Sequence, residues 1–340
     1  MKRIYQSLLI FCVTIIGCMT LLRTSAGSRY FWLASRLDEK GTFSQATIDT
    51  NATHFLFLVY FIEEDQGMYY ALSTDGINWQ PLYGGKPVFS PKTGSQQLVR
   101  DPAVYRGPDG VYRLVWTTGW RGKDIGYAYS SDLIHWSEPK ALAVGQTVDS
   151  INNCWAPEIF YNDRKKQYMV YWSSNIGPWR KPEGEGRIYA VTTKDFNTFS
   201  QPAILYRNGF PGGGQAGNDG PIDAFLYRNG KADYLFFYKK DDNTGVPNIY
   251  YRRGKSPEGP WQEEQGPIVP STGDEGPSCI KHNGLYHIYT DPFESDSAYV
   301  YLSRDLKRWE RKATNLSMKH GTVIEIPRKT AMGLLRLRPQ

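Results

Sequence analysis

The chain has 340 residues, of which 14% are aromatic, and it contains 33 glycines and 21 prolines. This mixture favours short strands joined by tight turns and argues against an architecture of long helices. The formal net charge is +6, but lysine and arginine are scattered without forming a run, so we expect an ordinary solvated surface and no nucleic-acid partner.

The first 27 residues have the pattern of a targeting leader: a basic start ("MKR"), an apolar run ("IYQSLLIFCVTIIGCMTLL") and small residues ("TSAG"). The leader predicts an exported protein, whether secreted, periplasmic or anchored at the cell surface. Cleavage, retention as a membrane anchor and lipid attachment at Cys18 remain alternatives, and we expect membrane contact only through this segment. Residues 28–340 show no linker and are predicted to form a single domain.

Only two cysteines, Cys154 and Cys279, lie outside the leader, which excludes a fold stapled by several disulfides. Burial as small apolar side chains is favoured over pairing. No group of cysteine and histidine residues has the spacing of a zinc site.

Along the chain, an aromatic strand and a second short strand recur five times, each time followed by a polar turn. The aromatic strands are "FLFLVYF", "VYRLVWTT", "QYMVYWSS", "DYLFFYKK" and "LYHIYTD". The turns are "STDGINW", "SSDLIHW", "TKDFNTF", "SPEGPW" and "SRDLKRW". Four units also open with an extra short strand: "DPAVYR", "PEIFYN", "DAFLYR" and "PSCIKH".

A repeat of roughly 45–65 residues with no helical pattern predicts an all-β fold, a five-bladed β-propeller with four-stranded antiparallel blades. The strand "HGTVIEIP" at 320–327 is expected to pair with the N-terminal unit and close the ring, because an open propeller would leave a sheet edge exposed. The aspartate of each polar turn is expected to fix the turn, and the tryptophan to pack between blades. We assign this motif no catalysis.

The first strand of a propeller blade begins near the central axis, so its first residues are candidates for a shared site. Four such strands place an acid at or just before their start: Asp101, Glu158, Asp223 and Glu275. Carboxyl groups gathered on one axis repel each other, which raises the pKa of at least one. Paired carboxyls among aromatic side chains suit glycosidic bond cleavage. The tryptophans expected near this site are Trp116, Trp120, Trp155, Trp172 and Trp179.

The order "RDPAVYR", "CWAPEIFYNDRKKQYMVYWSS", "IDAFLYRNGKADYLFFYK", "EGPSCIKHNGLYHIYT" and "HGTV" resembles glycoside hydrolase family 43 over nearly the whole mature chain. The resemblance implies an inverting hydrolase that removes arabinofuranosyl, xylosyl or galactosyl groups from plant-type oligo- or polysaccharides. Asp101 then matches the general base, Asp223 the residue that tunes the acid, and Glu275 the general acid. Inversion would place the carboxyls of Asp101 and Glu275 roughly 6.5–9.5 Å apart.

Substrate contacts are predicted as well, because aromatic faces stack on sugar rings. The predicted substrate-binding residues are Arg100, Trp120, Trp155, Glu158 and His320. His320 matches a histidine that meets water or a bound cation, so a structural calcium ion is an option there; no cofactor is expected to be required.

Three alternatives stay open. A register like that of the retaining sucrose- and fructan-cleaving propellers of family 32 would use Asp49, Asp101 and Glu158, and it draws support from the complete unit that precedes Asp101. The second alternative is a carbohydrate-binding propeller without activity. The third is a glycoside phosphorylase, which would need phosphate and a basic pocket.

Overall fold

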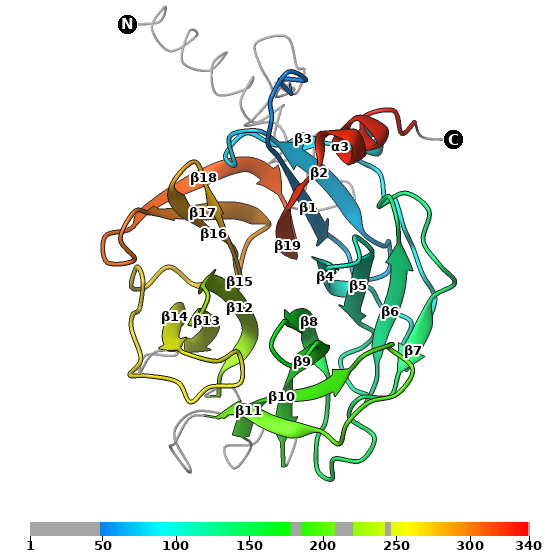
Figure 1. The fold of residues 1–340 in the computed structure, drawn as a ribbon, viewed down its shortest axis with the longest axis vertical. Coiled ribbons are helices and arrows are strands. Elements are labelled where there is room, and N and C mark those ends of the chain that lie inside the picture. The colour runs from blue at the N-terminus through cyan, green and yellow to red at the C-terminus, as the bar shows by residue number, and fades with distance from the viewer. Residues whose placement is uncertain (1–47, 178–184, 208–219, 242–245, 339–340) are drawn as a thin grey trace, which may run out of the picture. The chain divides into compact units, whose positions relative to one another are not determined.

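The computed structural model describes residues 48–177, 185–207, 220–241 and 246–338, which form five antiparallel sheets arranged around a central axis (Figure 1). The predicted all-β, five-bladed propeller is therefore confirmed. The predicted leader and Trp179 lie outside the described residues. Within the described ranges, no helix has the length and apolar character needed to cross a bilayer.

The blades are numbered in chain order, and their strands are given from the axis outward. Blade 1 comprises β19 (Lys319–Ile326), β1 (Phe55–Phe61), β2 (Tyr69–Ser73) and β3 (Gln80–Pro81). Blade 2 comprises β4 (Arg100–Arg106), β5 (Tyr112–Thr117), β6 (Ile125–Ser130) and β7 (Lys140–Leu142). Blade 3 comprises β8 (Trp155–Asn162), β9 (Gln167–Ile176), β10 (Glu185–Thr193) and β11 (Ala203–Arg207).

Blade 4 comprises β12 (Ile222–Gly230), β13 (Asp233–Asp241) and β14 (Pro247–Gly254). Blade 5 comprises β15 (Asp274–His282), β16 (Leu285–Pro292), β17 (Ser297–Ser303) and β18 (Glu310–Ser317). Four blades are thus four-stranded, as predicted. In the described part of blade 4, two isolated bridges, Tyr251 to Gln265 and Gly254 to Trp261, stand where the fourth strand would be.

The C-terminal strand closes the ring, as predicted. Strand β19 is the innermost strand of blade 1 and pairs antiparallel with β1, with Phe55 opposite Ile326 and Tyr60 opposite Gly321 (Figure 1). The five innermost strands contact one another in sequence around the axis. A helix that the sequence did not predict, α3 (Arg328–Leu334), follows β19 and buries Ala331 and Leu334 against the blade 1–2 core.

The core is divided into five hydrophobic clusters, one between each pair of neighbouring blades. Strands buried on both faces explain the nearly continuous apolar runs in the sequence, such as "FLFLVYF" in β1. Cys154 and Cys279 are buried and unpaired in two of these clusters, as expected.

The repeated polar turn has the structural role that was predicted. In blade 2, Asp132 Oδ1 accepts hydrogen bonds from the backbone N–H groups of Ile134 (2.9 Å) and His135 (2.8 Å), and Ser130 Oγ accepts one from Leu133 (2.9 Å). Asp75, Asp195 and Asp305 repeat the arrangement. The tryptophan that ends the first copy, Trp79, is fully buried and packs on Tyr289 between blades 1 and 5.

Candidate active site

Each innermost strand carries one extra residue close to its start. The register of pairing with the second strand shifts there in all five blades, which marks a β-bulge. The bulged residues, from blade 1 to blade 5, are His320, Asp101, Ala156, Asp223 and Gly276. All except His320 have a positive φ of 44–62°, a conformation that aspartate and glycine tolerate better than most residues. Bulges redirect side chains and are common beside active sites.

From the sequence we expected the four acids near the strand starts to occupy equivalent places in the repeat. The structure shows that they do not, so this expectation is wrong. Asp101 and Asp223 are bulged residues, whereas Glu275 is paired just before the bulge and Glu158 is paired just after it. The sequence shows an acid near each of these strand starts, but it does not show where the bulge lies. The bulge decides how far along the axis each side chain is placed.

A second set of residues lies opposite the position that precedes each bulge. These opposing residues are Phe61, Thr117, Ser173, Lys239 and Asp291, from blade 1 to blade 5. Four are polar or charged, and three of these four contact the strand start of the next blade. They lie near the ends of the second strands "VYRLVWTT", "QYMVYWSS", "DYLFFYKK" and "LYHIYTD", so the sequence contains a signal for them, but the strand pattern alone did not mark them as functional.

Asp101 is held by two neighbouring blades. Thr117 Oγ1 accepts the backbone N–H of Ala156 (2.8 Å) and donates its own hydrogen to Asp101 Oδ2 (2.8 Å). On the other side, the Nδ1 atom of His320 lies 3.6 Å from Asp101 Oδ1. The aspartate is therefore fixed through Oδ2 while Oδ1 faces the histidine.

Asp223 joins blades 3, 4 and 5. Its backbone N–H donates to Ser173 Oγ (2.9 Å), and its Oδ2 atom accepts the backbone N–H of Gly276 at 3.3 Å. Burial raises the pKa of Asp223, with Asp101 acting in the same direction, while His320 opposes the change. The Asp223 carboxyl therefore interacts electrostatically with Asp101 and is hydrogen-bonded to the start of the innermost strand of blade 5.

Glu275 has the properties expected of a proton donor. Its side chain is about one fifth exposed, and the Nζ atom of Lys239 lies 3.7 Å from its Oε2 atom. Burial raises the pKa of Glu275 to about 7, and the neighbouring Asp223 acts in the same direction, whereas Lys239 and His320 oppose it. A carboxyl with a pKa near neutrality holds a proton yet can release it.

Asp291 is a fifth acid of this region, and the sequence did not predict it. It is paired directly with Glu275 across β15 and β16, is only 1% exposed, and its buried Oδ1 atom has no hydrogen-bond partner. A Cβ atom on Gly276 would lie 2.9 Å from this Oδ1 atom and 2.8 Å from Cγ of His320. Burial raises the pKa of Asp291 well above its usual value, and Glu275 acts in the same direction.

Glu158 connects two blades that are not neighbours in the ring, blades 1 and 3. Thr322 Oγ1, on β19 of blade 1, donates to Glu158 Oε1 (2.9 Å), and the glutamate is 5% exposed. Burial raises its pKa to about 8. Glu158 follows the bulge, and its hydrogen bond with Thr322 joins blades 3 and 1 inside the protein. The predicted contact of Glu158 with substrate stays a prediction.

Three of the predicted substrate-binding residues form an aromatic and cationic cluster at the strand starts of blades 2 and 3. The Arg100 guanidinium lies 3.8 Å from the ring centre of Trp120, and Trp120 meets Trp155 edge to face at 5.9 Å. Glu64 accepts hydrogen bonds from Arg100 (2.9 Å) and Trp120 (3.4 Å). Trp120 is 37% exposed and presents a surface that a sugar ring could stack on. In contrast, the expected Trp116 and Trp172 are fully buried core residues.

Asp49 does not belong to the site. It is exposed in the turn before β1, and the carbonyl oxygen of the next residue, Thr50, accepts hydrogen bonds from Arg328 at the start of α3. Arg328 follows the end of β19 that is opposite to His320. The register with Asp49 as nucleophile is therefore wrong.

A metal ion is not supported by the donor set. Across the described ranges, no group of three or more histidine, cysteine, aspartate or glutamate residues is arranged to hold one. His320 faces a single carboxylate oxygen, at 3.6 Å. Calcium beside His320 remains a sequence prediction, and no chemical step is assigned to it.

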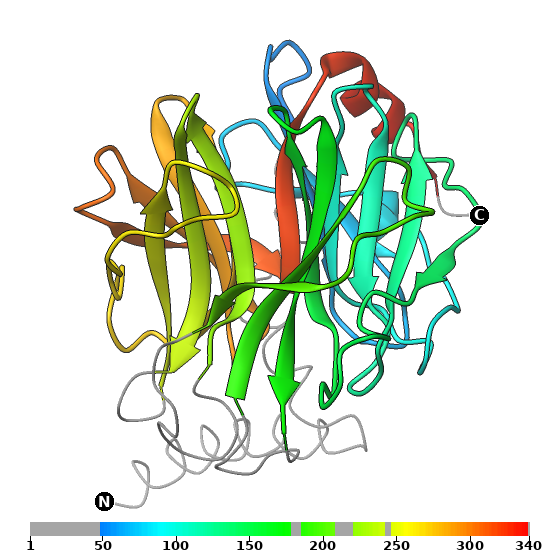
Figure 2. The same ribbon diagram turned by 60° about the horizontal axis from the view of Figure 1, so that its bottom comes forward.

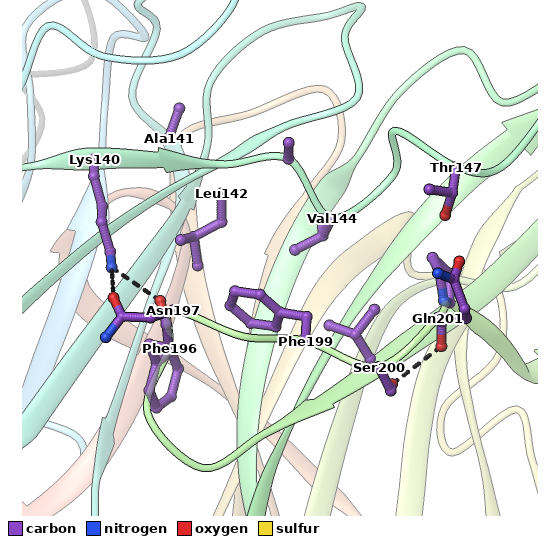
Figure 3. A pocket seen from close by; sticks show the side chains of 13 residues that line it. Lys140, Ala141, Leu142, Val144, Thr147, Phe196, Asn197, Phe199, Ser200 and Gln201 are labelled. Carbon is purple, nitrogen blue, oxygen red and sulfur yellow. Dashed lines mark hydrogen bonds between the residues drawn. The ribbon is translucent and has the colours of Figure 1, made fainter.

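A cavity of about 430 Å³ lies elsewhere, between the outer parts of blades 2 and 3 (Figure 3). Its lining includes Leu142, Val144 and Phe199, and the Nζ atom of Lys140 is bonded to the Phe196 carbonyl and to Asn197. None of the five acids lines it.

Buried carboxyls gathered at the strand starts of a five-bladed propeller define a glycosidase type of site. Residues 51–331 match the family-43-related glycosyl hydrolase model, described as a probable glycosyl hydrolase domain, and the chain belongs to this family. The family resemblance noted from the sequence motifs is thereby confirmed.

Individual relatives are distant. The chain is 23% identical over 209 residues to an alpha-L-arabinofuranosidase of Bifidobacterium longum, a match that covers 51% of this chain and 18% of that protein. The chain therefore spans less than a fifth of the length of this curated relative.

Among solved structures, an exo-beta-1,3-galactanase from Clostridium thermocellum matches with a TM-score of 0.51 and 15% identity, over 63% of this chain and 48% of that one. An alpha-L-arabinofuranosidase from Lactobacillus brevis matches with a TM-score of 0.49 and 14% identity, over 63% and 72% of the two chains. At 15% identity, the match to the galactanase shows the fold alone.

Proposed function

We propose that the protein is an exported glycosidase that removes arabinofuranosyl, xylosyl or galactosyl groups from oligo- or polysaccharides with inversion of configuration. The observation that carries the proposal is a group of three carboxyls at the inner strand starts of blades 2, 4 and 5, in which Asp223 interacts electrostatically with both Asp101 and Glu275. Asp223 accepts the Gly276 N–H, Asp101 faces His320, and Glu275 faces Lys239. Export rests on the predicted leader, and the sugar classes rest on the family resemblance.

In this mechanism Glu275 donates its proton to the oxygen of the leaving sugar. Burial and the neighbouring Asp223 raise the pKa of Glu275 to about 7, which keeps the carboxyl protonated below neutral pH. The glycosidic C–O bond breaks, its electron pair goes to the leaving oxygen, and Glu275 is left as a carboxylate.

Asp101 acts on the other side of the scissile bond, where its Oδ1 atom accepts a proton from the attacking water. The hydrogen bond from Thr117 to Oδ2 holds the carboxyl in one orientation, as a general base requires. The water oxygen forms the new bond to the anomeric carbon. Glu275 has lost one proton to the leaving group, and Asp101 has gained one from the water.

Purified protein incubated with aryl α-L-arabinofuranoside, β-D-xyloside and β-D-galactoside, with and without phosphate, tests the proposal. Phosphate-independent release of the free sugar from at least one substrate is the expected result. Sugar binding without cleavage of any glycoside would favour the non-catalytic alternative, and cleavage only with phosphate would favour a phosphorylase. Either result would overturn the proposal.

A further inference from the structure

Lys239 is a lysine buried inside the propeller, where it lies close to Glu275 and acts electrostatically on Asp223. It lies on β13 of blade 4, its side chain is 6% exposed, and it is paired with Ile222 at the start of β12. A lysine is rarely buried unless it is paired, because the charged ammonium loses its hydration. Its near neighbour is Glu275 on the next blade, at 3.7 Å.

Two other blades carry a hydroxyl residue at the position equivalent to Lys239. In blades 2 and 3 the opposing residues are hydroxyls, Thr117 and Ser173, and each accepts the backbone N–H of the bulged residue in the next blade. In blade 5 the corresponding N–H, that of Gly276, goes to Asp223 instead. The opposing position of blade 4 has no such N–H to satisfy, and a longer, charged side chain there extends to Glu275.

We propose that Lys239 is a positioning residue that orients the Glu275 carboxyl and stabilises its ionised form, so that Glu275 can release its proton during the reaction. The inference rests on the proposed function of Glu275 as the acid. A general acid must alternate between two protonation states, and a buried carboxyl without a cation nearby favours only the neutral one.

Two acids of the same region serve as internal comparisons. Glu158 is buried and receives a hydrogen bond from Thr322; burial raises its pKa to about 8. Asp291 is buried and its Oδ1 atom has no hydrogen-bond partner; its pKa lies far above the usual value. At Glu275, burial and Asp223 raise the pKa to about 7, while Lys239 at 3.7 Å and His320 act in the opposite direction. The charged and titratable groups that act on Glu275 are Asp223 on β12, Lys239 on β13, Asp291 on β16, and Lys319 and His320 on β19.

The test compares the pH dependence of kcat for Lys239→Met, Lys239→Arg and the matched control Lys240→Met. Loss of the ammonium raises the pKa of Glu275, so the alkaline limb of the profile should move upward by about one to two pH units in Lys239→Met. Lys239→Arg keeps the charge and should keep the limb within about half a unit of the wild-type position. Lys240 pairs with Glu264 instead, and its methionine variant should leave the limb unchanged.

A folded Lys239→Met protein whose alkaline limb coincides with that of the wild type would overturn the inference. So would a shift of equal size in Lys240→Met. If wild-type protein cleaves no glycoside, the proposed function fails on its own, and the kinetic comparison does not arise.

A measurement on the wild-type chain keeps the inference testable without turnover and without Lys239→Met. The side-chain ¹⁵N resonance of Lys239 should change as Glu275 titrates near pH 7, and this change should disappear in Glu275→Gln. A Lys239 resonance that is constant between pH 5 and pH 9, or that titrates identically in Glu275→Gln, would overturn the inference.

Discussion

The backbone N–H of Gly276 donates a hydrogen bond to Asp223 Oδ2 at 3.3 Å, across the boundary between blades 4 and 5. Gly276 immediately follows Glu275, so this bond ties the strand that carries the proposed acid to the carboxyl proposed to tune it. Figure 2 shows the two inner strands involved, β12 and β15, within the ring of blades.

Replacement of Gly276 by alanine should abolish most activity. Gly276 has a φ of 62°, and a Cβ atom would lie 2.8 Å from Cγ of His320 and 2.9 Å from Oδ1 of Asp291. We expect at least a 100-fold loss of kcat, because His320 and Asp291 must move. The control Gly284→Ala has the same backbone strain, at a φ of 76°, but meets nothing within 4 Å. It should cost about 1–2 kcal/mol of stability and leave kcat unchanged; equal kinetic losses in both variants would contradict the crowding argument.

Replacement of Glu275 by glutamine should slow substrates in proportion to their need for a proton. We expect kcat to fall by about 10²- to 10⁴-fold on glycosides with alcohol leaving groups and far less on activated aryl glycosides. The alkaline limb of the wild-type profile should lie near pH 7, where Glu275 loses its proton, and should vanish in the variant. A uniform loss on all leaving groups would mean that Glu275 is not the acid.

Asp101→Asn should abolish the hydrolysis of activated and unactivated substrates alike, because both need water activation.

A smaller loss of activity is expected in Thr117→Val, which removes the hydroxyl between the Ala156 N–H and Asp101. Loss of the acceptor for a buried N–H should cost about 1–3 kcal/mol of stability, and the freed carboxyl should lower kcat by about 10- to 100-fold. Thr118→Val is the control, since the Thr118 hydroxyl bonds to Asp124. A Thr118→Val loss as large as that of Thr117→Val would contradict the assignment.

Glu158→Gln should change how stability depends on pH. Folding raises the pKa of Glu158 from 4.5 to about 8, so the folded state binds more protons than the unfolded state between these values. The stability from this group is therefore complete below about pH 4.5 and is lost as pH rises through 8. A neutral glutamine removes this loss, and the variant should gain a few kcal/mol on the wild type between pH 5 and pH 9. Unfolding curves measured across this range, with exposed Glu138→Gln as control, check this; a constant difference would contradict it.

The sequence predicted the blades well because its signals are local. The turn aspartates bond to backbone N–H groups two and three residues away, as in the Asp132 turn, and this geometry needs no distant partner. The site was predicted only in part. Asp101, Asp223 and Glu275 were found as acids at strand starts, but their different levels follow from bulges, which depend on pairing with a second strand.

Residues that act across blade boundaries were missed for the same reason. Lys239 and Asp291 are polar residues near the ends of otherwise apolar strands, and their importance follows from the neighbouring blade rather than from local pattern. Asp49 was included because chain order suggested a first blade that begins there, whereas ring closure gives that place to β19. Helix α3 is short and lies after the last repeat, so the sequence contains no helical periodicity long enough to predict it.

The stereochemistry of the reaction is the most direct test of the proposed roles, because it depends on whether Asp101 acts as a general base on water or as a nucleophile. Proton NMR of the sugar formed in the first minutes of hydrolysis, before mutarotation, identifies its anomeric configuration. Direct attack by a water that Asp101 activates predicts a product with the configuration opposite to that of the substrate. A product that keeps the substrate's configuration would require a covalent intermediate and would contradict the roles assigned to both residues.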